Sequence, residues 1–202
     1  MLQITTQRTT TPKAKPDESN LGFGVHYTDH MLIIDHDEEQ GWHDARIVPY
    51  QPLELDPAAM VFHYAMESFE GLKAYRTPDG SIQLFRPDKN AQRMINTNHR
   101  MCLPSLPVED FIQAVKAIVS FDQTGFRTLR HQPVHPSVCN RYRAASGVRT
   151  SRTHKFIIVC SPSAHTTPPA SIRLRSSSRM STPVPARAAP ASPSAAATML
   201  HP

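Results

Sequence analysis

The distribution of acidic residues constrains this chain most, because no Asp or Glu occurs after Asp122. Residues 1–122 hold all 17 acidic residues and eleven Lys and Arg, a formal charge of −6. Residues 123–202 hold eleven Lys and Arg and no acid, a formal charge of +11. Because the surface of a globular domain mixes both signs of charge, the pattern predicts a folded domain that ends near Asp122.

Both ends of the chain are predicted to be disordered. Residues 1–20 are polar and rich in Thr, and residues 164–202 form a basic tail rich in Arg, Ser, Pro and Ala. Such segments bury too little apolar surface to offset the conformational entropy of folding. The first residues are weakly similar to an organelle transit peptide, so cytoplasmic and mitochondrial locations both stay open. No apolar run has the length of a membrane span, so no membrane partner is expected.

Residues 21–122 are predicted to form an α+β domain, an antiparallel sheet with packed helices. Strand patterns occur at 31–37, 45–55, 72–77 and 81–86, the last two joined by a Pro-Asp-Gly turn. Helical patterns follow at 87–101 and 107–121, and each opens on a proline. The second helix has an apolar stripe made by Phe111, Ala114, Val115, Ile118 and Val119.

The cysteines and histidines do not form a metal-binding pattern. Cys102, Cys139 and Cys160 are too few and too scattered for a zinc knuckle, so reduced thiols are expected. Four histidines fall between residues 26 and 43, at spacings that fit neither a helical site nor a zinc finger. We expect no metal, and we expect these histidines at the surface and in turns.

One segment is specific enough to indicate a family. Residues 63–94, HYAMESFEGLKAYRTPDGSIQLFRPDKNAQRM, closely resemble the branched-chain amino acid aminotransferases, pyridoxal-phosphate enzymes of fold type four. The likeness extends from Phe23 to Gln123, whereas D-amino acid aminotransferases and aminodeoxychorismate lyases share only the Phe-Glu-Gly element. The resemblance implies the small domain of that fold. It also implies transfer of an amino group from leucine, isoleucine or valine to 2-oxoglutarate. Ala65 stands where many relatives have glycine.

The resemblance also implies site residues. Arg93 matches the arginine that binds the cofactor phosphate, a task suited to the guanidinium fork. Tyr64 and Phe69 match aromatic positions that line the pocket for the branched side chain, and Phe23, or Tyr27 in its place, supplies another wall. Without the family, a solvated arginine and core aromatics would be the ordinary interpretation.

The family's Schiff-base lysine has no counterpart in this chain. In the family it lies downstream, in a Gly-rich segment of a larger domain, whereas Lys155 is the one lysine after Asp122 and lies in a family-like strand at residues 148–163. Residues 123–147 have nearly the family's length and none of its expected content, so they are interpreted as scrambled by frame shifts or mispredicted splicing. We therefore expect no large domain, no covalently attached cofactor, no transaminase activity and no family homodimer.

An alternative function belongs to a different class. The acid-free basic tail at residues 164–202 could bind RNA or an acidic partner through phosphate contacts. It has no interleaved aromatics on which bases could stack, so nucleic acid is the less favoured partner.

Overall fold

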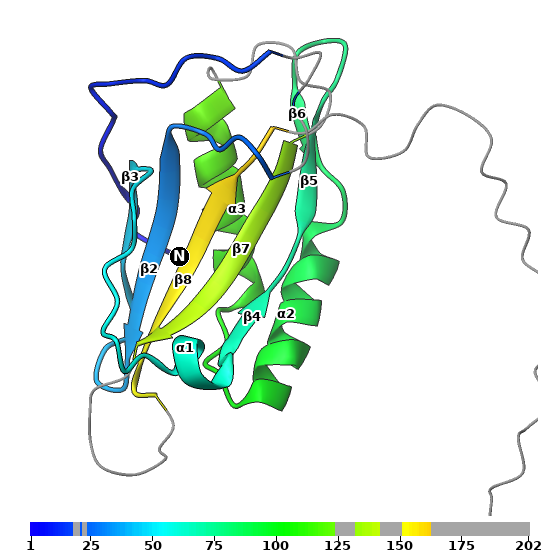
Figure 1. Cartoon of the computed structure of the whole chain (residues 1–202). Helices are drawn as coiled ribbons and strands as arrows, with labels where there is room; N and C mark the ends of the chain where they lie inside the picture. Colours follow the sequence, from blue (N-terminus) through cyan, green and yellow to red (C-terminus); the bar gives the residue numbers. More distant parts are fainter. Residues whose placement is uncertain (18–20, 22–23, 124–131, 142–150, 163–202) are drawn as a thin grey trace, which may run out of the picture. The chain divides into compact units, whose positions relative to one another are not determined.

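The chain folds around one mixed sheet that carries its two long helices on one face. A computed structural model describes residues 1–17, 21, 24–123, 132–141 and 151–162. The strand order among these residues is β1-β3-β2-β8-β7-β5-β6, and β4 also pairs with β7 (Figure 1). The strands are β1 (Thr5–Thr6), β2 (His30–Asp37), β3 (Gly41–Pro49), β4 (Glu67–Phe69), β5 (Leu72–Arg76), β6 (Ile82–Leu84), β7 (Gln132–Arg141) and β8 (Thr153–Cys160).

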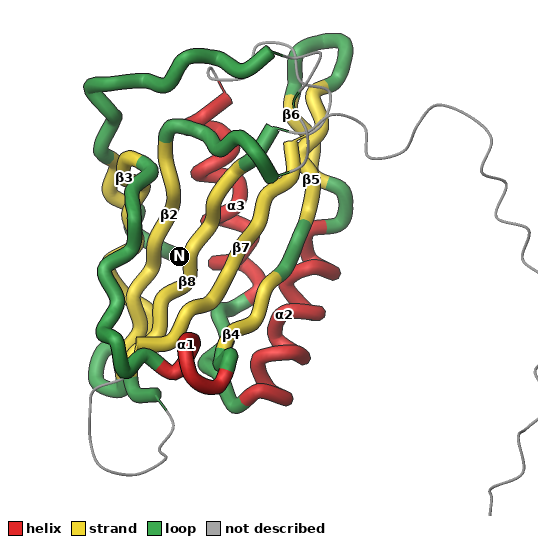
Figure 2. Tube along the Cα trace, in the orientation of Figure 1, coloured by secondary structure: helices red, strands yellow, loops and turns green. Residues whose placement is uncertain are grey.

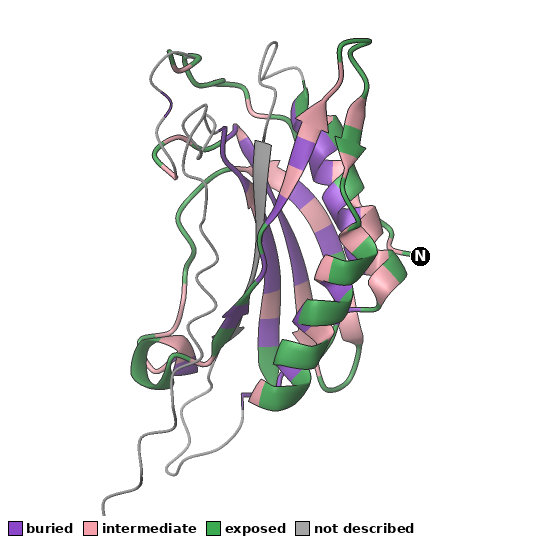
Figure 3. Cartoon of the chain, turned by 90° about the vertical axis from the view of Figure 1, so that its right-hand side faces the viewer, coloured by how far each residue is buried: buried purple, intermediate pink, exposed green. Residues whose placement is uncertain are grey.

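Three helices accompany the sheet in the described part of the chain: α1 (Met60–Tyr64), α2 (Pro87–Met101) and α3 (Val108–Asp122). The two long helices, α2 and α3, lie together behind the sheet (Figure 2). The short helix α1 projects from the opposite face (Figures 1 and 3). The strands pair antiparallel, apart from β1, which pairs in parallel with β3. This is the predicted α+β architecture of an antiparallel sheet with packed helices.

The core lies between the sheet and the two long helices. Its largest fully buried side chains include Phe111 and Ile118 from α3 and Phe156 from β8. The stripe predicted on α3 is buried along its whole length, as Figure 3 shows for the inner face of the helices. Burial of such side chains contributes about 1.5–3 kcal/mol each, so α3 is held mainly by this contact with the sheet.

The helix boundaries agree closely with the predicted ones. In α2 the predicted and observed ranges coincide, with Pro87 in the first turn and Asp88 beside the positive helix end. The helix stops at Cys102, which is left-handed at φ 55° and whose N–H bonds back to the carbonyls of Asn98 and His99. In α3 both ends lie one residue later than predicted.

The predicted strand in THKFIIVC is confirmed as β8, at the centre of the sheet. It pairs with β2 on one side, with Ile34 opposite Phe156, and with β7 on the other. The turn after β2 is closed by Asp37, whose carboxylate accepts the N–H groups of Glu39 and Gln40 at 2.9 and 2.7 Å. Gly41 then takes φ 68°, which favours glycine.

The prediction that residues 1–20 are disordered is wrong for residues 1–17. The backbone of Leu2 both donates to and accepts from the side chain of Gln113 on α3, at 2.9 and 2.8 Å. Strand β1 pairs with β3, and Leu2 and Ile4 pack against the core. A polar sequence can dock in this way because the backbone supplies the hydrogen bonds, and two apolar residues are too few to show a period.

Residues 123–147, interpreted from the sequence as scrambled, contain strand β7. Its backbone lies between β8 and the pair β4 and β5, so this part of the segment belongs to the sheet. The basic tail at 164–202 and the predicted aromatic Phe23 lie outside the described residues. No helix in the described ranges combines the length and the apolar character that crossing a bilayer requires.

Candidate functional site

The most organised polar site in the described domain is a buried carboxylate beside an exposed guanidinium. Glu70 lies between β4 and β5, and its side chain is only 3% exposed. Arg93 extends from α2, and 66% of its side chain is exposed. The Nε of Arg93 donates to Oε2 of Glu70 at 2.7 Å, and Nη2 donates to Oε1. This bidentate pair is the strong and orienting kind of ion pair.

Glu70 accepts further hydrogen bonds that fix its position. Its Oε1 accepts the backbone N–H of Gly71 at 2.9 Å and the side-chain amide of Asn90 at 3.0 Å. Burial by itself raises the pKa of Glu70, but the hydrogen bonds from Arg93 and Asn90 and the charge of Arg93 outweigh it and hold the pKa below its ordinary value. The same pairing raises the pKa of Arg93. The pair is therefore fully ionised at neutral pH.

The spacing of polar residues on α2 explains why the helix docks here. Asn90 and Arg93 are one helical turn apart and both reach Glu70. Two turns beyond Asn90, the buried Asn98 accepts the hydroxyl of Ser68 on β4 at 2.5 Å. These contacts fix α2 against the Phe-Glu-Gly segment, so the direction of the Arg93 side chain is set by several rigid elements.

The guanidinium retains unused hydrogen-bonding capacity. Its Nε and Nη2 are bonded to Glu70, and the described residues give Nη1 no partner. An exposed and oriented cation with vacant donors can bind a phosphate or a carboxylate.

The aromatic residues predicted to line a substrate pocket are exposed. Tyr64, at the end of α1, is 56% exposed, and Phe69, at the end of β4, is 79% exposed. Phe62 and Phe85 are also exposed, at 61% and 74%. Neither Tyr64 nor Phe69 is a core residue, which was the ordinary interpretation without the family. Exposed aromatics indicate an interaction surface where they form a contiguous patch.

The structure joins some of the predicted site residues and separates others. Phe69 directly precedes Glu70, so it shares a segment with the partner of Arg93. Tyr64 is on α1, on the other side of the sheet from α2 (Figure 3). Tyr27 stacks on Tyr50, with ring centroids 5.3 Å apart, and is 36% exposed. The assignment of Tyr64, Phe69 and Tyr27 to a substrate pocket stays a prediction.

Sequence reasoning missed Glu70 as the partner that orients Arg93. The sequence contains part of the signal, because the Phe-Glu-Gly element includes Glu70 and the spacing of Asn90 and Arg93 places both on one helix face. The distance between that face and the segment after β4 depends on tertiary packing, which no local pattern reports.

Lys155 forms an ion pair between two strands of the sheet. Its ammonium lies 2.5 Å from Oδ1 of Asp35, and Arg46 binds the other carboxylate oxygen at 2.7 Å. The Lys155 side chain is only 18% exposed. Burial raises the pKa of Asp35, but hydrogen bonds from Lys155 and Arg46 and their charges outweigh it, so this pKa lies below its ordinary value.

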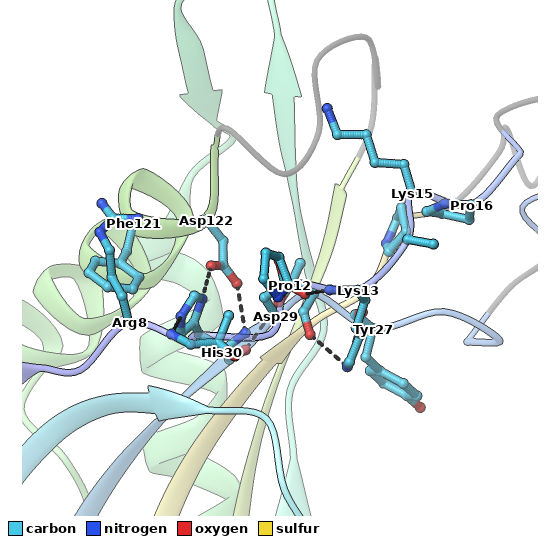
Figure 4. A pocket seen from close by; sticks show the side chains of 14 residues that line it. Arg8, Pro12, Lys13, Lys15, Pro16, Tyr27, Asp29, His30, Phe121 and Asp122 are labelled. Atoms are coloured by element: carbon cyan, nitrogen blue, oxygen red, sulfur yellow. Dashed lines mark hydrogen bonds and ion pairs between the residues drawn. The ribbon is translucent and has the colours of Figure 1, made fainter.

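A separate cavity of about 290 Å³ lies under the N-terminal segment (Figure 4). At its base His30, expected at the surface, is buried: its Nδ1 is 2.6 Å from Oδ1 of Asp122, and its Nε2 accepts the N–H of Thr9 at 2.9 Å. The second bond requires an unprotonated Nε2, so in the neutral ring the proton is on Nδ1. Lys13 and Lys15 are also part of the lining, which contains none of the site residues predicted by resemblance apart from Tyr27.

The chain is similar in sequence to proteins named branched-chain-amino-acid aminotransferase. It is 40% identical over 161 residues to branched-chain-amino-acid aminotransferase 2 of Bacillus subtilis, and the aligned region covers 79% of this chain and 44% of that protein. It is 41% identical over 150 residues to the Mycolicibacterium smegmatis protein, which covers 71% and 40%. The chain thus spans 40–45% of the length of the curated relatives it matches. No family model matches the sequence.

Solved structures show the same fold. A branched-chain amino acid aminotransferase from Escherichia coli superposes with a TM-score of 0.51 at 15% identity, over 66% of this chain and 40% of that one. The enzyme from Thermobaculum terrenum in its PLP form gives a TM-score of 0.50 at 18% identity, over 67% and 40%. The fold is therefore that of part of these proteins.

Proposed function

We infer the function of this chain from its family, because it is a relative of the branched-chain-amino-acid aminotransferases that spans 40–45% of their length. We propose that it forms the small-domain half of a pyridoxal-phosphate site for leucine, isoleucine or valine and 2-oxoglutarate. The observation that carries the proposal is the exposed guanidinium of Arg93, held by Glu70 with donors to spare.

The residues present fit the phosphate of the cofactor. A phosphate needs a cation with donors directed at it, and Arg93 meets both conditions. When bound, pyridoxal phosphate supplies the electron sink for amino-group transfer. The part of this chain would be to bind the phosphate and to offer Tyr64 and Phe69, and Phe23 from outside the described residues, as apolar walls for a branched side chain.

Covalent attachment of the cofactor does not fit this chain. Lys155, the one lysine after Asp122, lies in β8 and is paired with Asp35 on the neighbouring strand β2. We therefore propose that the 202-residue chain by itself binds pyridoxal phosphate weakly and reversibly and has no transaminase activity.

Two measurements on the purified 202-residue chain test this function. In a coupled assay with leucine and 2-oxoglutarate we expect no turnover. In a binding titration we expect pyridoxal 5′-phosphate to bind more tightly than pyridoxal, and Arg93→Ala to remove that difference. Turnover, or a borohydride-stable adduct on a lysine, would contradict the proposed inactivity. Equal binding of the two ligands would contradict the phosphate site.

A further inference from the structure

The ion pair between Glu70 and Arg93 lies at the boundary between the domain interior and solvent. The carboxylate is almost completely buried, whereas the guanidinium it binds is two-thirds exposed. A buried anion of this kind is costly unless each oxygen is satisfied. Arg93, Asn90 and Gly71 together meet that condition.

The geometry of the pair leaves one edge of the guanidinium for a ligand. Because Glu70 engages Nε and Nη2, rotation of the planar group about its last bonds is blocked, and the edge that carries Nη1 is directed away from the carboxylate. An unrestrained arginine side chain loses rotamer entropy when a ligand orders it. The pair with Glu70 has already ordered Arg93 before any ligand arrives.

We propose that Glu70 is a positioning residue that pre-orders Arg93 for the phosphate group of the ligand, and that it acts through Arg93 without touching the ligand. This inference rests on the proposed function, since it assigns a partner to the same phosphate site. It predicts that the charge of Glu70 sets phosphate affinity although it has the same sign as the phosphate. Simple electrostatics predicts the opposite, because removing a nearby negative charge should strengthen anion binding.

The test uses the 202-residue chain labelled with 15N, with pyridoxal 5′-phosphate as the probe and pyridoxal as the control without phosphate. Glu70→Gln keeps the shape of the side chain and removes its charge. Asp35→Asn is the control, because it breaks a second carboxylate pair outside the site, the less deeply buried one that Asp35 makes with Lys155 and Arg46. The signal of the Arg93 Nε–H group, identified by its loss in Arg93→Lys, reports directly on the order of the guanidinium.

We expect Glu70→Gln to weaken binding of pyridoxal 5′-phosphate at least about tenfold, as for loss of one charge-assisted interaction, and to broaden the Arg93 Nε–H signal. Asp35→Asn should bind like the original chain. In the Arg93→Lys background, Glu70→Gln should have no further effect on affinity, because the group through which it acts is gone. A general loosening of the domain would instead weaken binding in both backgrounds.

Two results would contradict the role of Glu70 alone, and a third would also contradict the phosphate site. If Glu70→Gln binds pyridoxal 5′-phosphate as tightly as the original chain or more tightly, Glu70 does not position Arg93. If Glu70→Gln weakens binding equally with Arg93 and with Lys at position 93, its role is structural. In both cases the proposed function stands. If the original chain does not distinguish pyridoxal 5′-phosphate from pyridoxal, the phosphate site itself is wrong and the inference fails with it.

Discussion

His154 and His36 form a cross-strand pair of neutral rings in the sheet. They are opposite each other on β8 and β2, with ring centroids 5.5 Å apart. The Nδ1 atoms of both are buried and have no hydrogen-bond partner among the described residues. Burial, with a smaller contribution from His36, lowers the pKa of His154 from 6.5 to about 4. Protonation of His154 would place a charge in the sheet beside His36, with no hydrogen-bond partner for its Nδ1 among the described residues.

The pair makes stability depend on pH with a definite sign. The pKa of His154 is 6.5 in the unfolded state and about 4 in the folded state, so between these values the unfolded state binds a proton that the folded state does not. Stability is therefore lost as the pH falls through this window, by up to about 3 kcal/mol. We expect His154→Phe to reduce the difference between urea unfolding at pH 7 and at pH 4.5. The exposed control His99→Phe should retain the original dependence, and an unchanged slope in His154→Phe would contradict the assignment.

Ala65 carries backbone strain. It ends α1 in the left-handed region at φ 47° and ψ 39°, where a Cβ atom costs about 1–2 kcal/mol. We expect Ala65→Gly to raise the free energy of unfolding by about 0.5 kcal/mol, because relief of this strain exceeds the entropy gained by the unfolded chain. Denaturant midpoints would measure it. Ala117→Gly in the regular part of α3 should do the reverse and cost about 1 kcal/mol. Destabilisation by both variants would argue against the strain.

Among the elements, α3 depends on its buried stripe. Ile118 is completely buried between the helix and the sheet. We expect Ile118→Ala to lower the free energy of unfolding by about 2–5 kcal/mol, through lost burial and a residual cavity. Lys116→Ala, on the exposed face of the same helix, should change it by less than about 0.5 kcal/mol. Chemical denaturation distinguishes the two, and similar effects would mean that α3 does not pack as described.

The N-terminal segment is held by a few specific bonds. Both backbone groups of Leu2 bond to Gln113, and the N–H of Gln7 bonds to the carbonyl of Ile47 at 2.8 Å. We expect Gln113→Ala to speed hydrogen exchange at the amides of Leu2 and Gln7 about tenfold, as for loss of about 1–2 kcal/mol of local stability.

The amides of β8 should be unaffected by Gln113→Ala, because the core does not depend on this bond. Gln92→Ala, which removes only an exposed bond within α2, provides the control. Protection that persists at Leu2 and Gln7 would mean that β1 alone holds the segment.

These elements differ in how far the sequence could predict them. Helices α2 and α3 have local signals, a proline at the start and an apolar stripe, and these signals are sufficient to predict both helices to within one residue at each end. Strand β1 has only two residues and is stabilised by an edge that another part of the chain provides. The buried position of His30 likewise depends on Asp122, 92 positions away, so no local pattern could predict it.

At the scale of the whole molecule, the exposed aromatics should control self-association. Phe62 and Phe85 are more than half exposed and belong to no core cluster of the described domain. We expect Phe62→Ser with Phe85→Ser to raise the concentration at which the chain stays monomeric in size-exclusion chromatography, without lowering its thermal stability. Phe111→Ser, in the core, should instead unfold it. Unchanged elution of the double variant at every concentration would contradict this.

The candidate site was predictable as a set of residues and not as an arrangement. Resemblance pointed to Arg93, Tyr64 and Phe69, and the structure adds the buried carboxylate that gives Arg93 its direction. That contact joins segments 23 positions apart and depends on the docking of α2. The assignment of ligands to these residues stays a prediction that the binding experiments test.

The central place of β8 has a consequence for biosynthesis. Asp35 on β2 and Lys155 on β8 form an ion pair although they are 120 positions apart. Strand β2 therefore cannot pair with β8 until β8 has been translated. A nascent chain that has not yet released residue 160 from the ribosome leaves one edge of β2 unpaired and the inner face of α3 only partly covered. The high contact order of this pairing slows folding and extends that exposure. Chaperone demand should therefore peak just before β8 emerges.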